Sequence, residues 1–88
     1  MYKIHYTREA KKDLKKIIQS KLKDVCLKLL KLIESDPLQN PPPYKKLKGS
    51  YSGIYSRRIN IQHRLFYEID EDNKRVKVLR SWSHYGDN

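Results

Sequence analysis

The chain has 88 residues, of which 38% are apolar, enough for one small hydrophobic core and a single domain over residues 1–88. Twenty Lys and Arg residues against ten Asp and Glu give a net charge of +10, and such a field attracts RNA, DNA, an anionic membrane or an acidic protein. The mean hydropathy of −0.90 leaves no run of ~18 apolar residues to span a bilayer. No apolar run follows the first residues, and the single Cys26 excludes an internal disulfide, so we expect a cytoplasmic protein without a membrane partner.

The first third of the chain predicts one strand and two helices. In residues 1–6, Tyr2, Ile4 and Tyr6 alternate with polar residues, which indicates a half-buried strand. Thr7 is suited to cap a helix whose apolar residues recur at helical spacing as far as Ile18. A second helix is predicted from one continuous apolar stripe formed by Leu22, Val25, Cys26, Leu29, Leu30 and Ile33.

The prolines that follow predict a loop over residues 35–50. Pro37 disfavours helix in the residue before it, so the second helix should end near Ser35. Three consecutive prolines, 41–43, exclude a further helix and supply no amide donors for a sheet.

Three strand-like runs complete the chain, at residues 54–61, 63–69 and 75–82, with a hairpin turn over 70–73. The order β-α-α-β-β-β predicts an α+β fold, in which a small antiparallel sheet carries two N-terminal helices on one face. In the last run, strict alternation would place Arg80 on the core side with Val76 and Val78. A β-bulge near Leu79 or Arg80 would remove this conflict.

Candidate metal and cofactor sites are lacking in this sequence. His5, His63 and His84 do not have the spacing of zinc ligands, and there is no glycine-rich phosphate loop. Cys26 lies on the apolar stripe and is expected in the core. We therefore expect neither a metal nor a cofactor.

Cations and aromatic rings concentrate between Tyr44 and Tyr67, where six basic residues and no acidic residue occur. Side chains that bind phosphate, interleaved with rings that stack on bases, are typical of single-stranded RNA sites. Ordinary strand residues with solvated tips would give the same pattern. RNA cleavage is chemically compatible with such a set, because the 2′-hydroxyl of the substrate is the nucleophile, histidine transfers protons near neutral pH, and arginine binds phosphate in two aligned bonds.

Four short blocks occur in order along the second half of the chain: Tyr44-Lys45-Lys46-Leu47-Lys48-Gly49, Tyr55-Ser56-Arg57-Arg58-Ile59-Asn60, His63-Arg64-Leu65-Phe66-Tyr67 and Ser83-His84-Tyr85. With the strand–helix–helix layout before them, they resemble the Txe/YoeB family of the RelE toxin superfamily. The resemblance implies a RelE-like fold and metal-independent cleavage of messenger RNA in the ribosomal A site. It also implies a YefM-like antitoxin whose acidic segment covers the active cleft, with operator DNA bound only through that antitoxin.

The resemblance also implies roles for individual residues. His84 matches the general acid, Arg58 and Arg64 match phosphate ligands, and Tyr85 matches a residue that contacts the base or the phosphate. Arg57 and Arg58 are adjacent, so on a strand at most one reaches the reacting phosphate, and the resemblance selects Arg58. Further substrate contacts are expected from the same stretch, at Lys46, Lys48, Tyr51, Tyr55, Arg57 and His63.

Two positions depart from the family pattern. Lys45 stands where members commonly have a glutamate general base, and a lysine accepts a proton only in its neutral form. The chain also continues past Tyr85 through Gly86-Asp87-Asn88. Two other functions also fit the sequence: a non-catalytic basic module that binds RNA or the ribosome, and a corepressor that depends on an antitoxin.

Overall fold

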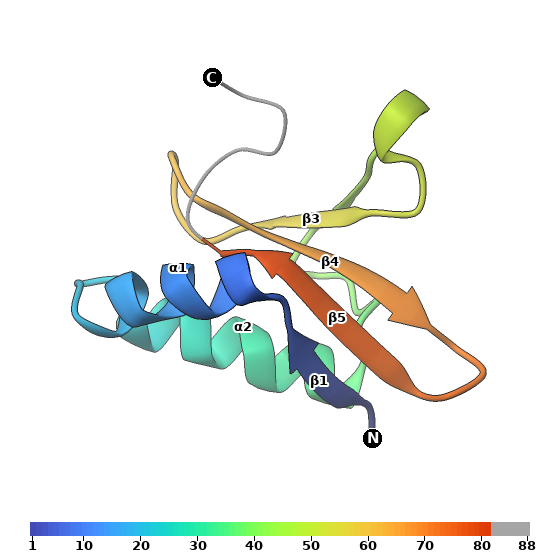
Figure 1. Ribbon diagram of the computed structural model, residues 1–88, viewed down its shortest axis with the longest axis horizontal. Helices are drawn as coiled ribbons and strands as arrows, with labels where there is room; N and C mark the ends of the chain where they lie inside the picture. Colours follow the sequence, from blue (N-terminus) through green and yellow to red (C-terminus); the bar gives the residue numbers. More distant parts are fainter. Residues whose placement is uncertain (82–88) are drawn as a thin grey trace.

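The computed structural model describes residues 1–81, which form two α-helices, one short 3-10 helix and five strands (Figure 1). In chain order the elements are β1 (Lys3–Tyr6), α1 (Arg8–Ile18), α2 (Lys23–Ser35), β2 (Lys45–Lys46), η1 (Gly49–Tyr51), β3 (Tyr55–Arg58), β4 (Arg64–Asp70) and β5 (Arg75–Arg80). This confirms the predicted α+β fold and the order of its main elements. No helix within residues 1–81 is long and apolar enough to cross a bilayer.

The five strands form one mixed sheet in the order β1-β5-β4-β3-β2. Neighbouring strands are antiparallel except at one edge, where β1 pairs parallel to β5. The parallel pair adds to the antiparallel sheet predicted from the sequence. The two-residue strand β2 lies inside the segment that the sequence predicted as a loop. It is a strand only because it pairs with β3, and a pattern along one segment does not predict such a pairing.

The first helix begins where its capping residue predicts. The Thr7 hydroxyl accepts a hydrogen bond from the Ala10 amide at 3.1 Å and donates one to the Leu79 carbonyl at 2.8 Å. Thr7 therefore caps α1 and also ties the start of the helix to the end of β5. The second helix ends at Ser35, ahead of Pro37, as the sequence predicted.

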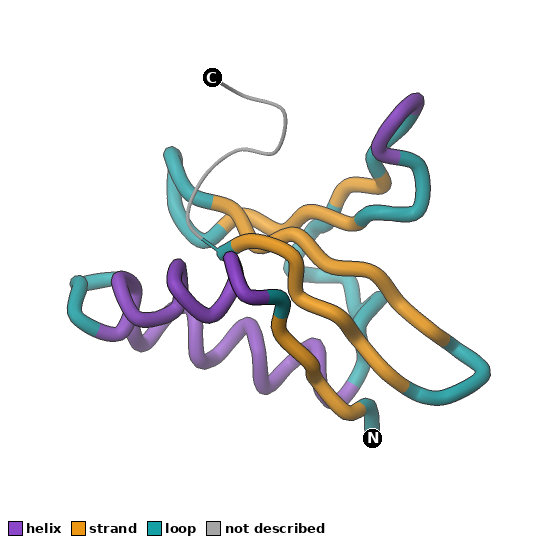
Figure 2. Tube along the Cα trace, in the orientation of Figure 1, coloured by secondary structure: helices purple, strands orange, loops and turns teal. Residues whose placement is uncertain are grey.

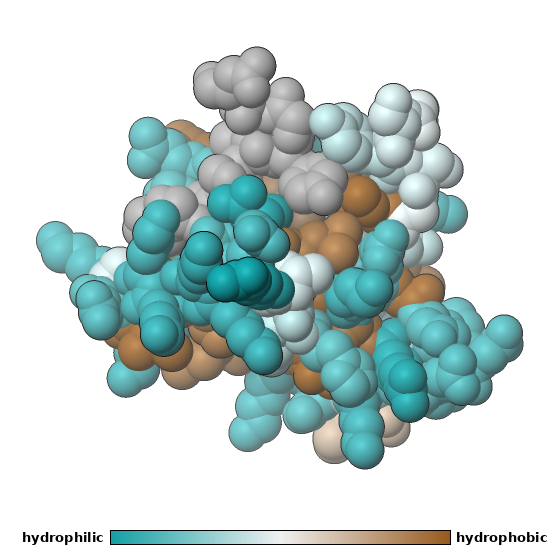
Figure 3. Space-filling model, in the orientation of Figure 1, coloured by the Kyte–Doolittle hydropathy of each residue, from teal (hydrophilic) through white to brown (hydrophobic). Residues whose placement is uncertain are grey.

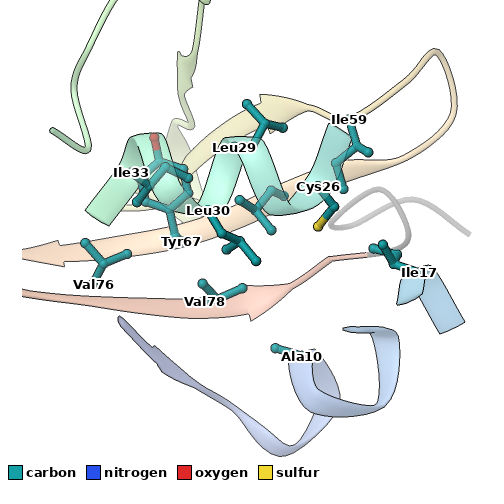
Figure 4. Packing of buried hydrophobic residues seen from close by; sticks show 11 residues of the cluster. Ala10, Ile17, Cys26, Leu29, Leu30, Ile33, Ile59, Tyr67, Val76 and Val78 are labelled. Carbon is teal, nitrogen blue, oxygen red and sulfur yellow. The ribbon is translucent and has the colours of Figure 1, made fainter. Parts of the chain in front are cut away.

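Both helices pack on the same face of the sheet, as the purple helices and orange strands of Figure 2 show. Figure 4 shows the core between them, where side chains of α1 and α2 meet those of the strands, including Tyr67, Val76 and Val78. Leu65 belongs to the same buried cluster. The buried stripe of α2 is narrower than predicted. The Val25 side chain is 44% exposed, because only one flank of this short helix contacts the sheet.

The predicted bulge is present in β5. Tyr67 pairs with Val78 and Phe66 pairs with Arg80, which leaves Leu79 as the extra residue. Beyond the bulge, the Arg80 guanidinium reaches α1, where its Nε lies 2.8 Å from Oδ2 of the buried Asp13. The Ser81 amide donates to the same oxygen at 3.1 Å. The end of β5 is thus fixed to α1 by an ion pair that joins residues 67 positions apart in the chain.

Candidate site on the open face of the sheet

Strand register sorts the predicted site residues onto two faces of the sheet. Residues directly opposite one another in an antiparallel pair share a face, and successive residues along a strand alternate. Lys45 lies opposite Ser56, and Arg58 lies opposite Arg64. Because Ser56 and Arg58 are two positions apart on β3, all four side chains belong to the face that the helices leave open. In the orientation of Figure 1, hydrophilic residues cover much of the visible surface, with apolar residues between them (Figure 3).

These four residues line a cavity of about 330 Å³ together with Pro43 and Tyr44. The Arg64 guanidinium donates to the Ser56 hydroxyl at 3.1 Å, and Ser56 is only 1% exposed, so this bond fixes Arg64 against the sheet. The Arg58 side chain is exposed.

The electrostatics of this cavity favour an anion. Two guanidinium groups project from Cβ atoms that are about 5 Å apart in such a cross-strand pair, and like charges placed opposite each other disfavour the folded state. No carboxylate is among the described residues that line the cavity. A phosphate bound between Arg58 and Arg64 would relieve their repulsion and accept aligned bonds from both.

The predicted substrate ligand Arg57 lies on the other face, and this corrects the sequence-based expectation. Its side chain is 1% exposed, and its place opposite the core residue Leu65 puts it on the helix side of the sheet. The guanidinium donates to the Tyr67 hydroxyl and to the carbonyls of Pro37, Gln39 and Pro42. Four of its five N–H donors are used in these bonds, and the buried side chain does not reach a substrate on the open face.

Two further predicted contacts also lie away from the cavity. Tyr55 stacks on Tyr67, with ring centroids 5.8 Å apart and an interplanar angle of 20°, and packs against the core. The Lys46 ammonium lies 5.9 Å from the centroid of the Tyr55 ring. Alternation along β2 and β3 places both on the helix side, opposite to Lys45 and Ser56.

Three other predicted contacts lie on loops outside this cavity. Lys48 and Tyr51 are exposed at the 3-10 helix, which stands clear of the sheet ahead of the first residue of β3 (Figure 1). His63 lies in the turn between β3 and β4, where its carbonyl accepts from the Ile59 amide at 2.9 Å and its amide donates to Asn60 at 2.7 Å. Their roles toward a substrate stay predictions.

The predicted general acid His84 and the neighbouring Tyr85 lie outside the described residues. Sequence reasoning assigned no role to Ser56, although its position two residues before Arg58 on one strand is the signal that would have placed it beside the arginines. Among residues 1–81, no group of three His, Cys, Asp or Glu side chains is placed to hold a metal ion.

Known toxins share this architecture. A YoeB/ParE toxin from Agrobacterium tumefaciens superimposes with a TM-score of 0.85 at 24% identity, covering 94% of this chain and 99% of that one. A Staphylococcus aureus YoeB solved in a heterotetrameric complex with YefM superimposes with a TM-score of 0.80 at 32% identity, covering 97% and 99%. The fold, with its cationic open face, is thus that of a small RelE-like toxin domain.

Sequence comparison gives the particular family. The model for the YoeB-like toxins of bacterial type II toxin–antitoxin systems matches residues 4–85. A "Toxin YoeB" from Mycobacterium bovis is 36% identical over 58 residues, which span 66% of this chain and 66% of that relative. The chain belongs to the YoeB-like toxin family.

Proposed function

We propose that this toxin is a metal-independent endoribonuclease that cleaves messenger RNA in the ribosomal A site and thereby inhibits translation. The observation that carries the proposal is the pairing of Arg58 with Arg64 across β3 and β4, on the face that the two helices leave open, in a chain with a net charge of +10. This arrangement has the charge and spacing to bind one phosphodiester group.

The reaction needs three contributions from the protein. A base removes the proton of the 2′-hydroxyl, cations stabilise the extra negative charge of the phosphorane-like transition state, and an acid protonates the leaving 5′-oxygen. Arg58 and Arg64 supply the cations, and the bond from Arg64 to Ser56 holds that guanidinium in place before substrate binds. Lys45 lines the same cavity and acts either as the base in its neutral form or as a further phosphate ligand.

The acid in this proposal is His84, with Tyr85 contacting the base or the phosphate. In the sequence, His84 and Tyr85 come a few residues after Arg80, the last residue of β5. The ion pair of Arg80 with Asp13 anchors the point from which they extend. An imidazole suits the step because its ordinary pKa of ~6.5 lies near neutral pH.

An acidic antitoxin of the YefM type is the proposed partner. The Staphylococcus aureus YoeB, which has the same fold, was solved in complex with YefM. The excess of positive charge and the carboxylate-free cavity favour an acidic segment that covers Arg58 and Arg64 and blocks RNA. Operator DNA would then be bound through the antitoxin.

The test is cleavage of a defined message on translating ribosomes, with ribosome binding measured in parallel. Arg58→Gln, Lys45→Ala and His84→Ala should each lower the cleavage rate strongly, and Arg75→Gln serves as a control that removes an exposed arginine outside the cavity. Removal of one preorganised donor typically lowers the rate by about 10²–10³. Activity should persist when a chelator selective for transition metals is added and the Mg²⁺ that the ribosome requires is kept constant.

Each result decides between the possible functions. If the wild type binds ribosomes and cuts no message, the nuclease proposal is wrong and the chain is a non-catalytic binding module. If it represses an operator only together with an antitoxin and binds no ribosome, the corepressor function stands instead.

A further inference from the structure

The segment between α2 and β2 has more carbonyl acceptors than amide donors. Four of its residues are prolines, at positions 37 and 41–43, and proline has no N–H. Carbonyl groups held against the protein must still find donors, because a buried carbonyl without a partner is costly. Pro37 is among the fully buried residues of the chain. The donors for this segment have to come from elsewhere in the fold.

Arg57 supplies these donors from the neighbouring strand β3. Its two terminal nitrogens donate to the carbonyls of Pro42 at 2.7 Å, Gln39 at 2.8 Å and Pro37 at 3.1 Å. Its Nε donates to the Tyr67 hydroxyl at 2.9 Å, and that hydroxyl donates to the Pro37 carbonyl at 2.8 Å. One buried side chain thus joins both ends of a six-residue segment to the core.

An arginine suits this position better than any other cation. Its planar guanidinium offers five donors in fixed directions, whereas a lysine offers three from a single atom. A buried charge without compensating dipoles is strongly unfavourable, and here three carbonyl groups and a hydroxyl surround it. Within the described residues, no carboxylate forms an ion pair with it. Three of its hydrogen bonds go to this segment, and the fourth goes to Tyr67, whose hydroxyl bonds the same segment.

The clamped segment leads directly into one wall of the cationic cavity. Pro42 is followed by Pro43, Tyr44 and Lys45, which all line it. The Arg57 guanidinium carbon also lies 5.1 Å from the centroid of the Tyr44 ring. The strand that carries Lys45 is only two residues long, and among residues 1–81 its one neighbour in the sheet is β3. Its position consequently depends on the segment before it.

We propose that Arg57 is a positioning residue: from the helix side of the sheet it holds the 37–42 segment, and so places Tyr44 and Lys45 at the phosphate cavity on the open side. The two arginines of β3 then have different roles. Arg58 binds the substrate, and Arg57 positions the residues that line the cavity beside it. This inference rests on the proposed nuclease function for its kinetic consequences, and on contacts alone for its structural ones.

Arg57→Lys is the test, because it keeps the positive charge and removes the planar set of guanidinium donors. Misplacement of a reacting group by about 1 Å can cost roughly 10²-fold in rate, so we expect kcat to fall by about 10- to 100-fold. KM for the ribosome-bound message should change by less than threefold, because Arg58 and Arg64 keep their places. Val76→Ala, a core substitution remote from this segment, is the control for lost stability and should retain the wild-type kcat well below its melting temperature.

A double-mutant cycle separates positioning from a general loss of stability. If Arg57 acts through Lys45, Arg57→Lys should cost much less in a Lys45→Ala background than in the wild type. A purely structural role predicts the same fold-loss in both backgrounds, and that result would overturn the proposal.

Amide hydrogen exchange gives a readout that needs no activity. The Leu47 amide, bonded to the Ile54 carbonyl at 2.9 Å, reports on the connection between the clamped segment and β3. It should exchange faster in Arg57→Lys than in Val76→Ala, and equal exchange would contradict the clamp. If Arg57→Lys does not fold, Tyr67→Phe removes only the hydroxyl that links Arg57 to Pro37 and serves in its place. A wild type without nuclease activity would overturn the proposed function, while exchange would still decide the role of Arg57.

Discussion

Substituting Arg58 should make the protein more stable and less active at the same time. Arg58 faces Arg64 across the β3–β4 pair, and no carboxylate lines their cavity among the described residues. At a separation of about 7 Å in water, two unit charges repel by roughly 0.6 kcal/mol. This agrees with the ~0.2–1 kcal/mol typical of cross-strand pairs. Arg58→Gln removes this repulsion, and the bond from Arg64 to Ser56 remains.

The gain should appear in thermal unfolding at low salt. For a domain of this size, about 0.5 kcal/mol corresponds to a rise in Tm of about 2–4 °C. The rise should be largest near ~0.01 M ionic strength and vanish near ~1 M, where the screening length falls from about 30 Å to 3 Å. Cleavage by the same variant should fall by about 10²–10³.

Arg75→Gln is the matched control. Arg75 lies opposite Asp70 on the same sheet, and hydrogen bonds from Asn73, followed by smaller effects that include the charge of Arg75, lower the pKa of that carboxyl. Its removal should leave Tm unchanged or lower. If Arg58→Gln lowers Tm at low salt, or shifts it equally at all salt concentrations, the site is not strained by charge and the reasoning for a preorganised phosphate site is refuted.

Three other perturbations test separate parts of the structure. Asp13→Asn weakens the bonds from Arg80 and Ser81 at a buried carboxylate and should lower the unfolding free energy in urea by about 2–3 kcal/mol; a change below ~0.5 kcal/mol would show that this ion pair does not anchor β5. Burial raises the pKa of the Cys26 thiol to about 11, so as pH rises from 9 to 11 the unfolded chain releases a proton that the folded chain keeps, and stability falls. Cys26→Ala should show a shallower loss of stability over this window, and an unchanged slope would exclude the thiol as its source. His84→Ala should abolish cleavage and leave ribosome binding within a few-fold, whereas full activity would remove His84 from the mechanism.

Local sequence signals predicted most of the fold. Thr7 begins α1, and Pro37 limits α2, because capping and proline geometry act over a few residues. The turn after Asp70 and the bulge at Leu79 were also predicted from local signals. In β5, the alternation of apolar and polar residues is interrupted near Leu79. The cations of the site were recognisable as residue types in a motif.

Tertiary structure decided which of those cations form the site. Arg57 and Arg58 are neighbours of the same type. Only the pairing of β3 with β4 and the packing of the 37–42 segment determine that one is buried and the other faces the open side. The parallel pairing of β1 with β5 and the strand status of Lys45 likewise depend on contacts between distant segments. Periodicity along a single segment specifies two faces, and it does not specify what covers each of them. Residue chemistry and local conformation were therefore contained in the sequence, whereas the accessibility and convergence of these side chains arose only from how the segments pack.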